Sequence, residues 1–450
     1  MTRWAGRWPY LLWVAFPLLG AVWLAGLSPP LATLPAVAPR IAPTGAPATS
    51  LGLFLLQLLV LLLVAKGAGA LLRRLGQPAV IGEMAAGLLM GPLLLGSALP
   101  GVQAALFPPS SLGSLGLLSQ LGVLMFLLVA GAELDLGALR GRRRLALTVS
   151  HAGIAVPFLF GVLLAMALFA DHAPPGVGFT AFALFVGIAL SITAFPVLLR
   201  ILADRGLTHT PLGQTAIACA ALGDATAWCL LALVVAVVQA SGWLAALRDL
   251  LGVVAFIAVM LAVVRPWFAR QTVVPGREGR WLLGLLLLAL ASALLTELLG
   301  IHALFGAFAA GVAVSSNAQL RALVMARVEP FAVTLLLPLF FAMTGLRLQA
   351  DALQVGDLAL CAGVIAVATG GKLLGTYGAA RSAGMDRRSG LRLGALMNTR
   401  GLMELIVLTL GYDLGLLGDR LFAVLVVMAL VTTAMTGPLL NLLERRTRPP

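Results

Sequence analysis

The chain consists of long apolar runs separated by short polar segments. After residue 50, thirteen runs of roughly 17–28 apolar or small residues follow one another, and a helix of that length crosses a bilayer. They lie at about 51–72, 78–98, 111–132, 145–170, 177–203, 211–239, 243–264, 281–299, 302–318, 330–349, 356–380, 391–411 and 417–442. The pattern predicts an all-α polytopic membrane protein with about 13 transmembrane helices.

The segments outside these runs differ in character. Residues 1–27 hold two arginines followed by an apolar run, which is typical of a signal peptide or an N-terminal anchor. Residues 28–50 form a Pro/Ala-rich linker. We therefore expect one transmembrane domain over 51–443 and a short cytoplasmic tail at 444–450.

The chain also repeats itself. Ala79–Gly87 is similar to Ala303–Gly311, and Phe126–Leu134 is similar to Phe340–Leu348, in the same order and at nearly the same offset. Six apolar runs precede the run at 243–264 and six follow it, so one linking helix would reverse the second set. We expect two inverted six-helix repeats, 51–239 and 281–443, with a binding site at mid-membrane between crossed broken helices.

Composition and charge agree with a membrane protein. Hydrophobic residues make up 61% of the 450 and charged residues only 10%, with a mean hydropathy of +1.05. The net charge of +13 comes mainly from arginines in alternate loops: one set of loops holds 21 and the other set four. The positive-inside rule then puts the C-terminus in the cytoplasm and the mature N-terminus outside, across a bacterial inner membrane. This distribution argues against a nucleic-acid partner.

One ionisable residue lies in the middle of the run 211–239. Asp224 is surrounded by about thirty apolar or small residues. A carboxylate near the bilayer centre costs about 2.5–3.5 kcal/mol on insertion scales, so such a residue usually binds something. The functional interpretation is a carboxylate that binds a proton or a monovalent cation; the structural alternative is an aspartate hydrogen-bonded to a neighbouring helix.

Lysine is rare in this chain. Only Lys66 and Lys372 are lysines among 30 basic residues, and Lys372 lies inside the run 356–380. Buried lysine loses its proton readily, whereas arginine effectively never does. Lys372 is therefore a candidate charge partner or proton carrier, unless its side chain reaches the membrane interface.

Two of the runs are predicted to break. Ser191 and Thr193 precede Pro196, which removes a backbone donor and opens the helix near Thr193. The equivalent break lies at 398–401. Opened backbone can coordinate a cation, although Ser191 and Thr193 can equally bond to carbonyls of their own helix. Arg400 and Glu404 are four residues apart and are expected to form a structural pair.

These residues resemble those of the monovalent cation:proton antiporter family 2, within the sodium/hydrogen exchanger superfamily. The resemblance covers about 51–443. It rests on the segments Gln77–Pro92, Ser191–Pro196, Gly223–Asp224, Pro338–Phe341 and Asn398–Val407. Glu83, within the first of these segments, is an accessory charge on an access path or an interface.

The resemblance implies a homodimer that moves in an elevator fashion, with Asp224 as the ion-binding aspartate. It also implies Lys372 as the core lysine of electrogenic members and Thr193 near the ion. Gly223 departs from the pattern, because electrogenic bacterial members carry an aspartate there. No Gly-x-Gly-x-x-Gly segment is present, so we expect neither a nucleotide-binding domain nor a cofactor.

The predicted function is the exchange of protons for Na⁺ or K⁺, with both competing for Asp224. Three alternatives remain: a cation channel, a proton-coupled solute carrier and an intramembrane aspartyl protease. The protease alternative rests on Tyr412-Asp413 together with Asp224. The chain is not expected to be an enzyme, and the three cysteines show no spacing typical of a disulfide or metal site.

Overall fold

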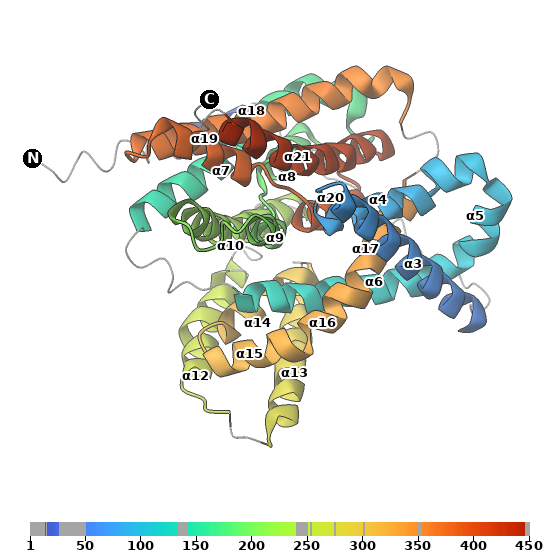
Figure 1. Ribbon diagram of the computed structural model, residues 1–450, viewed down its shortest axis with the longest axis horizontal. Helices are drawn as coiled ribbons and strands as arrows, with labels where there is room; N and C mark the ends of the chain where they lie inside the picture. Colours follow the sequence, from blue (N-terminus) through green and yellow to red (C-terminus); the bar gives the residue numbers. More distant parts are fainter. Residues whose placement is uncertain are drawn as a thin grey trace, which may run out of the picture.

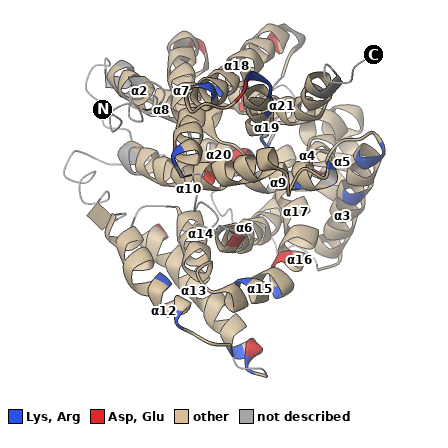
Figure 2. Ribbon diagram, turned by 60° about the vertical axis from the view of Figure 1, so that its left-hand side comes forward, with Lys and Arg blue, Asp and Glu red and all other residues tan. Residues whose placement is uncertain are grey.

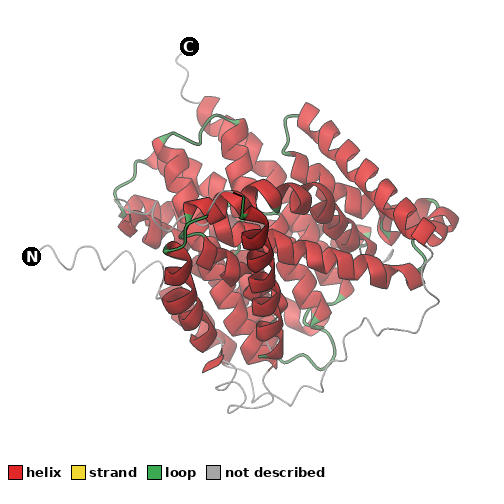
Figure 3. Cartoon of the chain, turned by 90° about the horizontal axis from the view of Figure 1, so that it is seen from below, coloured by secondary structure: helices red, strands yellow, loops and turns green. Residues whose placement is uncertain are grey.

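The chain is helical throughout the part that can be described. The computed structural model describes residues 14, 16–26, 51–133, 143–239, 251–252, 254–273, 276–299, 302–348 and 353–445. Within these ranges, turns connect helices and there is no strand (Figure 1, Figure 3). The predicted fold class is confirmed. The linker at 28–50 and residues 243–250 and 253 of the linking run lie outside the described residues.

Eight helical stretches in the described ranges are long and apolar enough to cross a membrane. They are α3 (Leu51–Arg74), α6 (Pro109–Glu133), α7 (Arg143–His172), α10 (Pro211–Gln239), α13 (Glu278–Leu298), the run Ala318–Leu346, α18 (Leu358–Ser382) and α21 (Asp419–Arg445). The count of thirteen spans stays a prediction.

Shorter α-helices account for much of the remaining described chain. They are α2 (Phe16–Gly26), α4 (Ala79–Met90), α5 (Pro100–Leu106), α8 (Phe179–Ser191), α9 (Phe195–Asp204), α12 (Arg265–Ala269), α14 (Ala303–Val314), α15 (Ala318–Arg327), α16 (Glu329–Phe331), α17 (Leu337–Leu346), α19 (Arg387–Met397) and α20 (Leu402–Asp413). Short π- or 3₁₀-helical segments lie at Pro92–Gly96, Met260–Val264, Ala332–Leu336 and Val355–Asp357. The predicted signal peptide or anchor contains α2, which packs against α7 and α8.

The helices pack into two groups. The core bundle consists of α7–α10 and α18–α21, and the flanking bundle consists of α3, α4, α6, α13, α14, α15 and α17. Contacts within each bundle are extensive. The two bundles meet where α4 contacts α21 and α17 contacts α20, and where the Trp228 ring of α10 packs against Phe305 and Phe308 of α14. Figure 2 shows α14, α13 and α15 below the core bundle, and charged residues are sparse along most ribbons.

The repeated sequence segments pack against each other across the two halves of the chain. Gly87 of α4 lies on the backbone of α17, where an added Cβ would meet the Phe341 carbonyl oxygen at 2.0 Å, and a Cβ on Gly345 would meet the Gly87 carbonyl oxygen at 1.9 Å. In the same way Gly311 of α14 lies on α6 beside Gly131, where the distance would be 2.2 Å. Each first-half segment thus crosses a second-half segment through repeat-related glycines, which explains why the matched residues include them.

One predicted loop is a helix instead. The segment between the runs 302–318 and 330–349 was expected to be an inner loop, but α15 occupies it and continues through α16 into α17. The Asn317 side chain accepts hydrogen bonds from the N–H groups of Gln319 and Leu320, which caps α15. The sequence shows no separate apolar run there, because Arg321 and Arg327 lower the hydropathy of the segment that forms α15.

Candidate functional site

Two interrupted helices cross in the core bundle. α8 ends at Ser191 and α9 begins at Phe195, while α19 ends at Met397 and α20 begins at Leu402. Both breaks lie where the sequence predicts them. The Ala194 N–H donates to the Thr399 carbonyl at 3.0 Å, which joins the two opened segments directly.

Side chains and backbone conformation hold this crossing in place. The Thr193 hydroxyl donates to the Met397 carbonyl at 3.0 Å, from one opened segment to the end of the other helix. Gly401 has φ +152°, a conformation that residues with a side chain rarely adopt, and an added Cβ would meet Val197 at 2.9 Å. Glycine at position 401 is therefore required for the chain to turn into α20.

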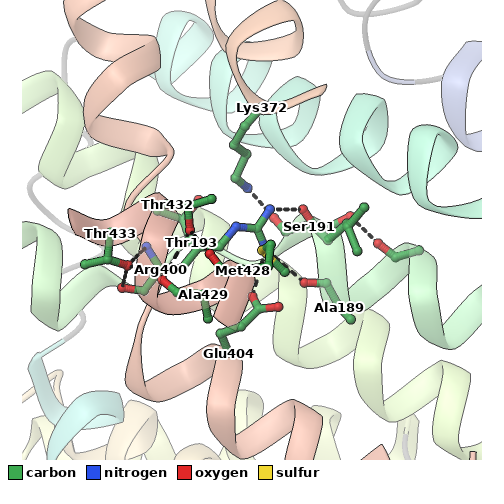
Figure 4. Close-up of polar contacts among 12 residues, drawn as sticks. Ala189, Ser191, Thr193, Lys372, Arg400, Glu404, Met428, Ala429, Thr432 and Thr433 are labelled. Atoms are coloured by element: carbon green, nitrogen blue, oxygen red, sulfur yellow. Dashed lines mark hydrogen bonds and ion pairs between the residues drawn. The ribbon is translucent and has the colours of Figure 1, made fainter. Parts of the chain in front are cut away.

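Two buried cations bind the carbonyl groups at the end of α8. Arg400 donates to the Ala189 carbonyl at 3.0 Å and to the Leu190 carbonyl at 2.5 Å. Lys372 donates to the Ser191 carbonyl (Figure 4). It also donates to the Gly153 carbonyl of α7 at 2.7 Å. The last carbonyls of a helix have no partner within it and carry partial negative charge. Arg400 and Lys372 therefore serve as the C-terminal cap of the broken helix.

The Arg400–Glu404 pair is fully buried. Arg400 Nη1 lies 2.9 Å from a Glu404 carboxylate oxygen, and both side chains have no exposed surface. The two residues are four apart in the sequence, and their ion pair is the structural pair that the sequence predicts. Glu404 balances the charge of Arg400, and Lys372 and Asp224 are a second pair of opposite charges buried in the core bundle.

Asp224 lies in the middle of α10 and faces the crossing. Its side chain is 4% exposed, and the backbone N–H of Phe195, at the start of α9, donates toward its carboxylate. The other carboxylate oxygen, Oδ1, has no hydrogen-bond partner among the described residues. Lys372 lies near enough to attract the carboxylate electrostatically, and Glu133 near enough to repel it.

The cavity at Asp224 is small and otherwise apolar. It has a volume of about 10 Å³, close to the minimum for holding one water molecule. Side chains of α10 and α20 and of Ile192 line it, and no second carboxylate does so among the described residues. Asp224 is thus enclosed between the crossing and α20 in this conformation.

The other predicted site residues fall in different places. The Ser191 hydroxyl donates to the Gly187 carbonyl at 2.7 Å, the local bond that the sequence left as an alternative, so Ser191 offers its carbonyl to the site instead. Glu83 lies in the flanking bundle, where it forms an ion pair with Lys66 at 2.8 Å. The structure therefore does not bring Glu83 to the cavity at Asp224.

Several features of the site escape sequence analysis. Gly153 contributes a backbone carbonyl, which no side-chain pattern reveals. Both polar atoms of the Asn398 amide are buried without a partner among the described residues, although this residue belongs to the predicted break. A Cβ at Gly223 would lie 3.2 Å from the Ser150 hydroxyl of α7, one turn from the Gly153 carbonyl that binds Lys372.

The dyad required by the protease alternative is not assembled. Asp413 lies at the end of α20, where it pairs with Arg347 of α17 at 2.5 Å. The neighbouring Tyr412 hydroxyl donates to Asp419 at 2.6 Å. Neither residue lines the cavity at Asp224.

Comparisons with known proteins agree on one family. Residues 58–443 match the family described as sodium/hydrogen exchanger, transmembrane. The Na⁺/H⁺ antiporter NhaS4 of Synechocystis is 39% identical over 393 residues, which cover 86% of this chain and 96% of that protein. Cation/H⁺ antiporter 18 of Arabidopsis thaliana is 38% identical over 399 residues. That alignment covers 86% of this chain but only 48% of the plant protein, so the chain spans about half its length.

A solved structure has the same fold. The sodium proton antiporter MjNhaP1 of Methanocaldococcus jannaschii superposes with a TM-score of 0.63 at 13% sequence identity. The match covers 88% of this chain and 97% of the archaeal one.

Proposed function

We propose that this chain, which belongs to the sodium/hydrogen exchanger family, exchanges protons for a monovalent cation through alternate occupation of Asp224. The observation that carries the proposal is the enclosed Asp224 carboxylate, with one oxygen unpartnered, beside the crossing of two broken helices. Related proteins are named as antiporters of sodium, of potassium or of both. The transported ion is therefore Na⁺ or K⁺.

Competition for one carboxylate is sufficient to couple the two fluxes. A proton and a monovalent cation each neutralise Asp224, and neither can bind while the other is present. Burial makes the bare carboxylate costly, so the site crosses the membrane readily only when it is neutralised. Each inward step of one ion then requires an outward step of the other.

The remaining polar groups position Asp224. The N-terminal end of α9 directs a backbone N–H toward the carboxylate and so favours negative charge there. The Thr193 hydroxyl and the opened carbonyl groups lie at the same crossing and are the proposed additional ligands of the cation. Lys372 stays bound to its carbonyls and acts as a fixed charge partner.

Alternating access follows from the two-bundle architecture. The core bundle holds all of these groups, and its backbone comes close to that of the flanking bundle at few places. We infer that the core bundle slides against the flanking bundle in an elevator fashion and carries Asp224 from one side to the other. The flanking bundle would form the homodimer. The arginine-rich loops support a cytoplasmic C-terminus, in the inner membrane of a bacterial cell.

The test is Asp224→Asn in proteoliposomes with an internal pH-sensitive dye. Addition of lithium, sodium or potassium should release protons in the wild type and should not do so in the variant. Asparagine keeps the size of the side chain but takes up no proton in this range. The matched control is Asp386→Asn, because Asp386 caps α19 through the Ser389 N–H and asparagine caps equally well.

Both variants should be extracted as folded protein, and the control should transport as the wild type does. Cation-dependent proton release by Asp224→Asn at a rate near that of the wild type would mean that another group carries the ion. Release that follows voltage with single-channel currents would favour the channel alternative instead.

A further inference from the structure

A polar cavity lies between the two bundles, away from Asp224. It has a volume of about 380 Å³ and is lined from the flanking bundle by Arg73 and Gln77 and from the core bundle by Arg205 and Gly437. No acidic residue lines it among the described residues. A cavity of this size holds a small ligand.

One of the two arginines is held in a fixed orientation. Arg205 donates to the Asn441 side-chain oxygen at 2.8 Å and to the Gly437 carbonyl at 3.1 Å. Both acceptors are neutral, so the charge of the guanidinium is not cancelled by these contacts. A guanidinium has five N–H donors, and those not used by α21 remain to bind a ligand.

The second arginine comes from the other bundle. Arg73 lies in the last turn of α3, is exposed and forms no ion pair among the described residues. The turn that follows leads into α4, whose N-terminus has no side-chain cap and adds a weaker preference for negative charge. Two guanidinium groups, one from each bundle, thus line one cavity that lacks a balancing acid.

We propose that this cavity binds a phosphate-bearing anion, which bridges Arg73 and Arg205 and so links the two bundles. Arginine suits this role, since its planar fork donates two parallel hydrogen bonds to phosphate oxygens. The cavity lies where α3 and α9 end and α4 begins, on the arginine-rich side of the predicted topology. Phosphate is available there as a lipid headgroup in the bilayer surface and as free phosphate in solution.

The first experiment measures binding and does not depend on transport. Purified protein in detergent is unfolded by heat with phosphatidylglycerol, with phosphatidylcholine, or with inorganic phosphate in phosphatidylcholine. Phosphatidylglycerol should raise the unfolding temperature above that in phosphatidylcholine, because a ligand that binds only the folded state stabilises it. Most of this increment should be lost in Arg73→Gln and in Arg205→Gln and kept in Arg74→Gln.

The variants separate binding from folding. Arg205→Gln also removes contacts with α21 and can lower stability without ligand. The proteins are therefore compared by the increase in unfolding temperature that the ligand causes, and not by the unfolding temperature itself. Arg73→Gln has no such contacts among the described residues. An increment with the lipid alone identifies the headgroup as the source, whereas an increment with inorganic phosphate identifies a soluble anion. No increment with either, or an equal increment in all four proteins, would overturn the proposal.

A second experiment tests the link between the bundles and rests on the proposed function. In liposomes, the stabilising anion should slow cation-dependent proton release by the wild type and by Arg74→Gln. The rate of Arg73→Gln should depend less on the anion. If the anion binds but does not change the rate of proton release, it does not link the two bundles. The bridging part of the proposal then fails, while the binding part stands.

Discussion

The buried cations of the core bundle form hydrogen bonds with backbone carbonyl groups, in addition to balancing the charge of buried carboxylates. Arg400 and Lys372 together bind the last three carbonyls of α8, which would otherwise be unpaired in a low-dielectric interior. Their side chains are fully buried. Nearly all basic residues of this chain are arginines, but position 372 is a lysine. Its compact ammonium group fits between two carbonyl groups from different helices.

This arrangement predicts that Lys372→Arg impairs exchange although the positive charge is kept. The wider guanidinium does not fit between the Gly153 and Ser191 carbonyls, because α18 packs against α7 so closely that a Cβ at Gly375 would lie 2.4 Å from the Ala152 carbonyl. A displacement of about 1 Å at a reacting group costs on the order of 100-fold in rate. We expect a loss of this order in the dequenching assay, with the protein still folded.

The comparison variant is Lys66→Arg, at the other lysine of the chain. Lys66 is partly exposed and pairs with Glu83, a carboxylate that arginine also binds well. It should transport normally. Equal rates for both variants would show that position 372 needs only a fixed charge.

The second prediction at this scale concerns charge movement. Under the proposed mechanism, with Gly223 in place of an acid and Lys372 bound to carbonyls, only Asp224 would change its occupant, so we expect one proton to exchange for one cation. A membrane potential imposed with valinomycin and a potassium gradient should then not drive sodium uptake at matched pH. Sodium uptake that follows the potential would require a second proton carrier.

Gly223→Asp extends this test. The new side chain would point toward Ser150 of α7, one turn from the carbonyl that binds Lys372, and would offer the lysine a counter-ion. Uptake by this variant should become sensitive to the potential. Gly223→Ser, which adds a neutral side chain at the same place, is the control for crowding.

At the scale of elements, an ion pair links helices of different bundles. Arg347 of α17 and Asp413 of α20 lie 2.5 Å apart beside a cavity of about 40 Å³. The proposed elevator movement must separate them, whereas Lys66 and Glu83 pair within the flanking bundle and should stay together. The two pairs therefore distinguish movement between bundles from movement within one.

Cysteine pairs at these positions test the movement, after the three native cysteines are replaced by serine. Oxidation of a chain carrying Arg347→Cys and Asp413→Cys should stop exchange, and reduction should restore it. Oxidation of the Lys66→Cys, Glu83→Cys chain should leave exchange nearly unchanged. Full activity of the first chain when cross-linked would mean that α17 and α20 do not move past each other.

A second contact between elements predicts a pH effect on stability. Asp357, just before α18, accepts hydrogen bonds from Arg420 of α21 and from the Gln354 N–H, which hold the pKa of its carboxyl below the usual value. A lowered folded-state pKa gives stability that is present above the unfolded pKa of about 3.9 and lost as pH falls through the folded value. The effect should be small, because Arg420 is 54% exposed and solvent screens the pair.

The measurement compares the wild type with Asp357→Asn by thermal unfolding in detergent. Between neutral pH and pH 3, the unfolding temperature of the wild type should fall further than that of the variant. Parallel curves would show that this contact contributes no pH-dependent stability.

At the scale of the whole molecule, the sequence predicted what repeats along the chain and missed what depends on backbone contacts. Apolar runs, the breaks at Thr193 and Gly401 and the isolated Asp224 are visible because each changes local composition. The carbonyl partners of Lys372 are invisible, since any residue supplies the same carbonyl group. The α15 helix was missed for a related reason: its cap at Asn317 is local, but its polar face leaves no apolar signal.

The cap at the end of α8 has a consequence for how the protein is made. Arg400 is 210 and 211 residues away from the two carbonyls that it binds, and Lys372 is 181 residues away from Ser191. Synthesis proceeds from the N-terminus, so α8 enters the membrane long before either cation exists. Until α18 and the segment before α20 are inserted, those carbonyls depend on lipid headgroups, water or the insertion machinery for partners. The end of α8, in the first half of the chain, therefore gains its partners only when the second half of the chain is inserted, near the end of biogenesis.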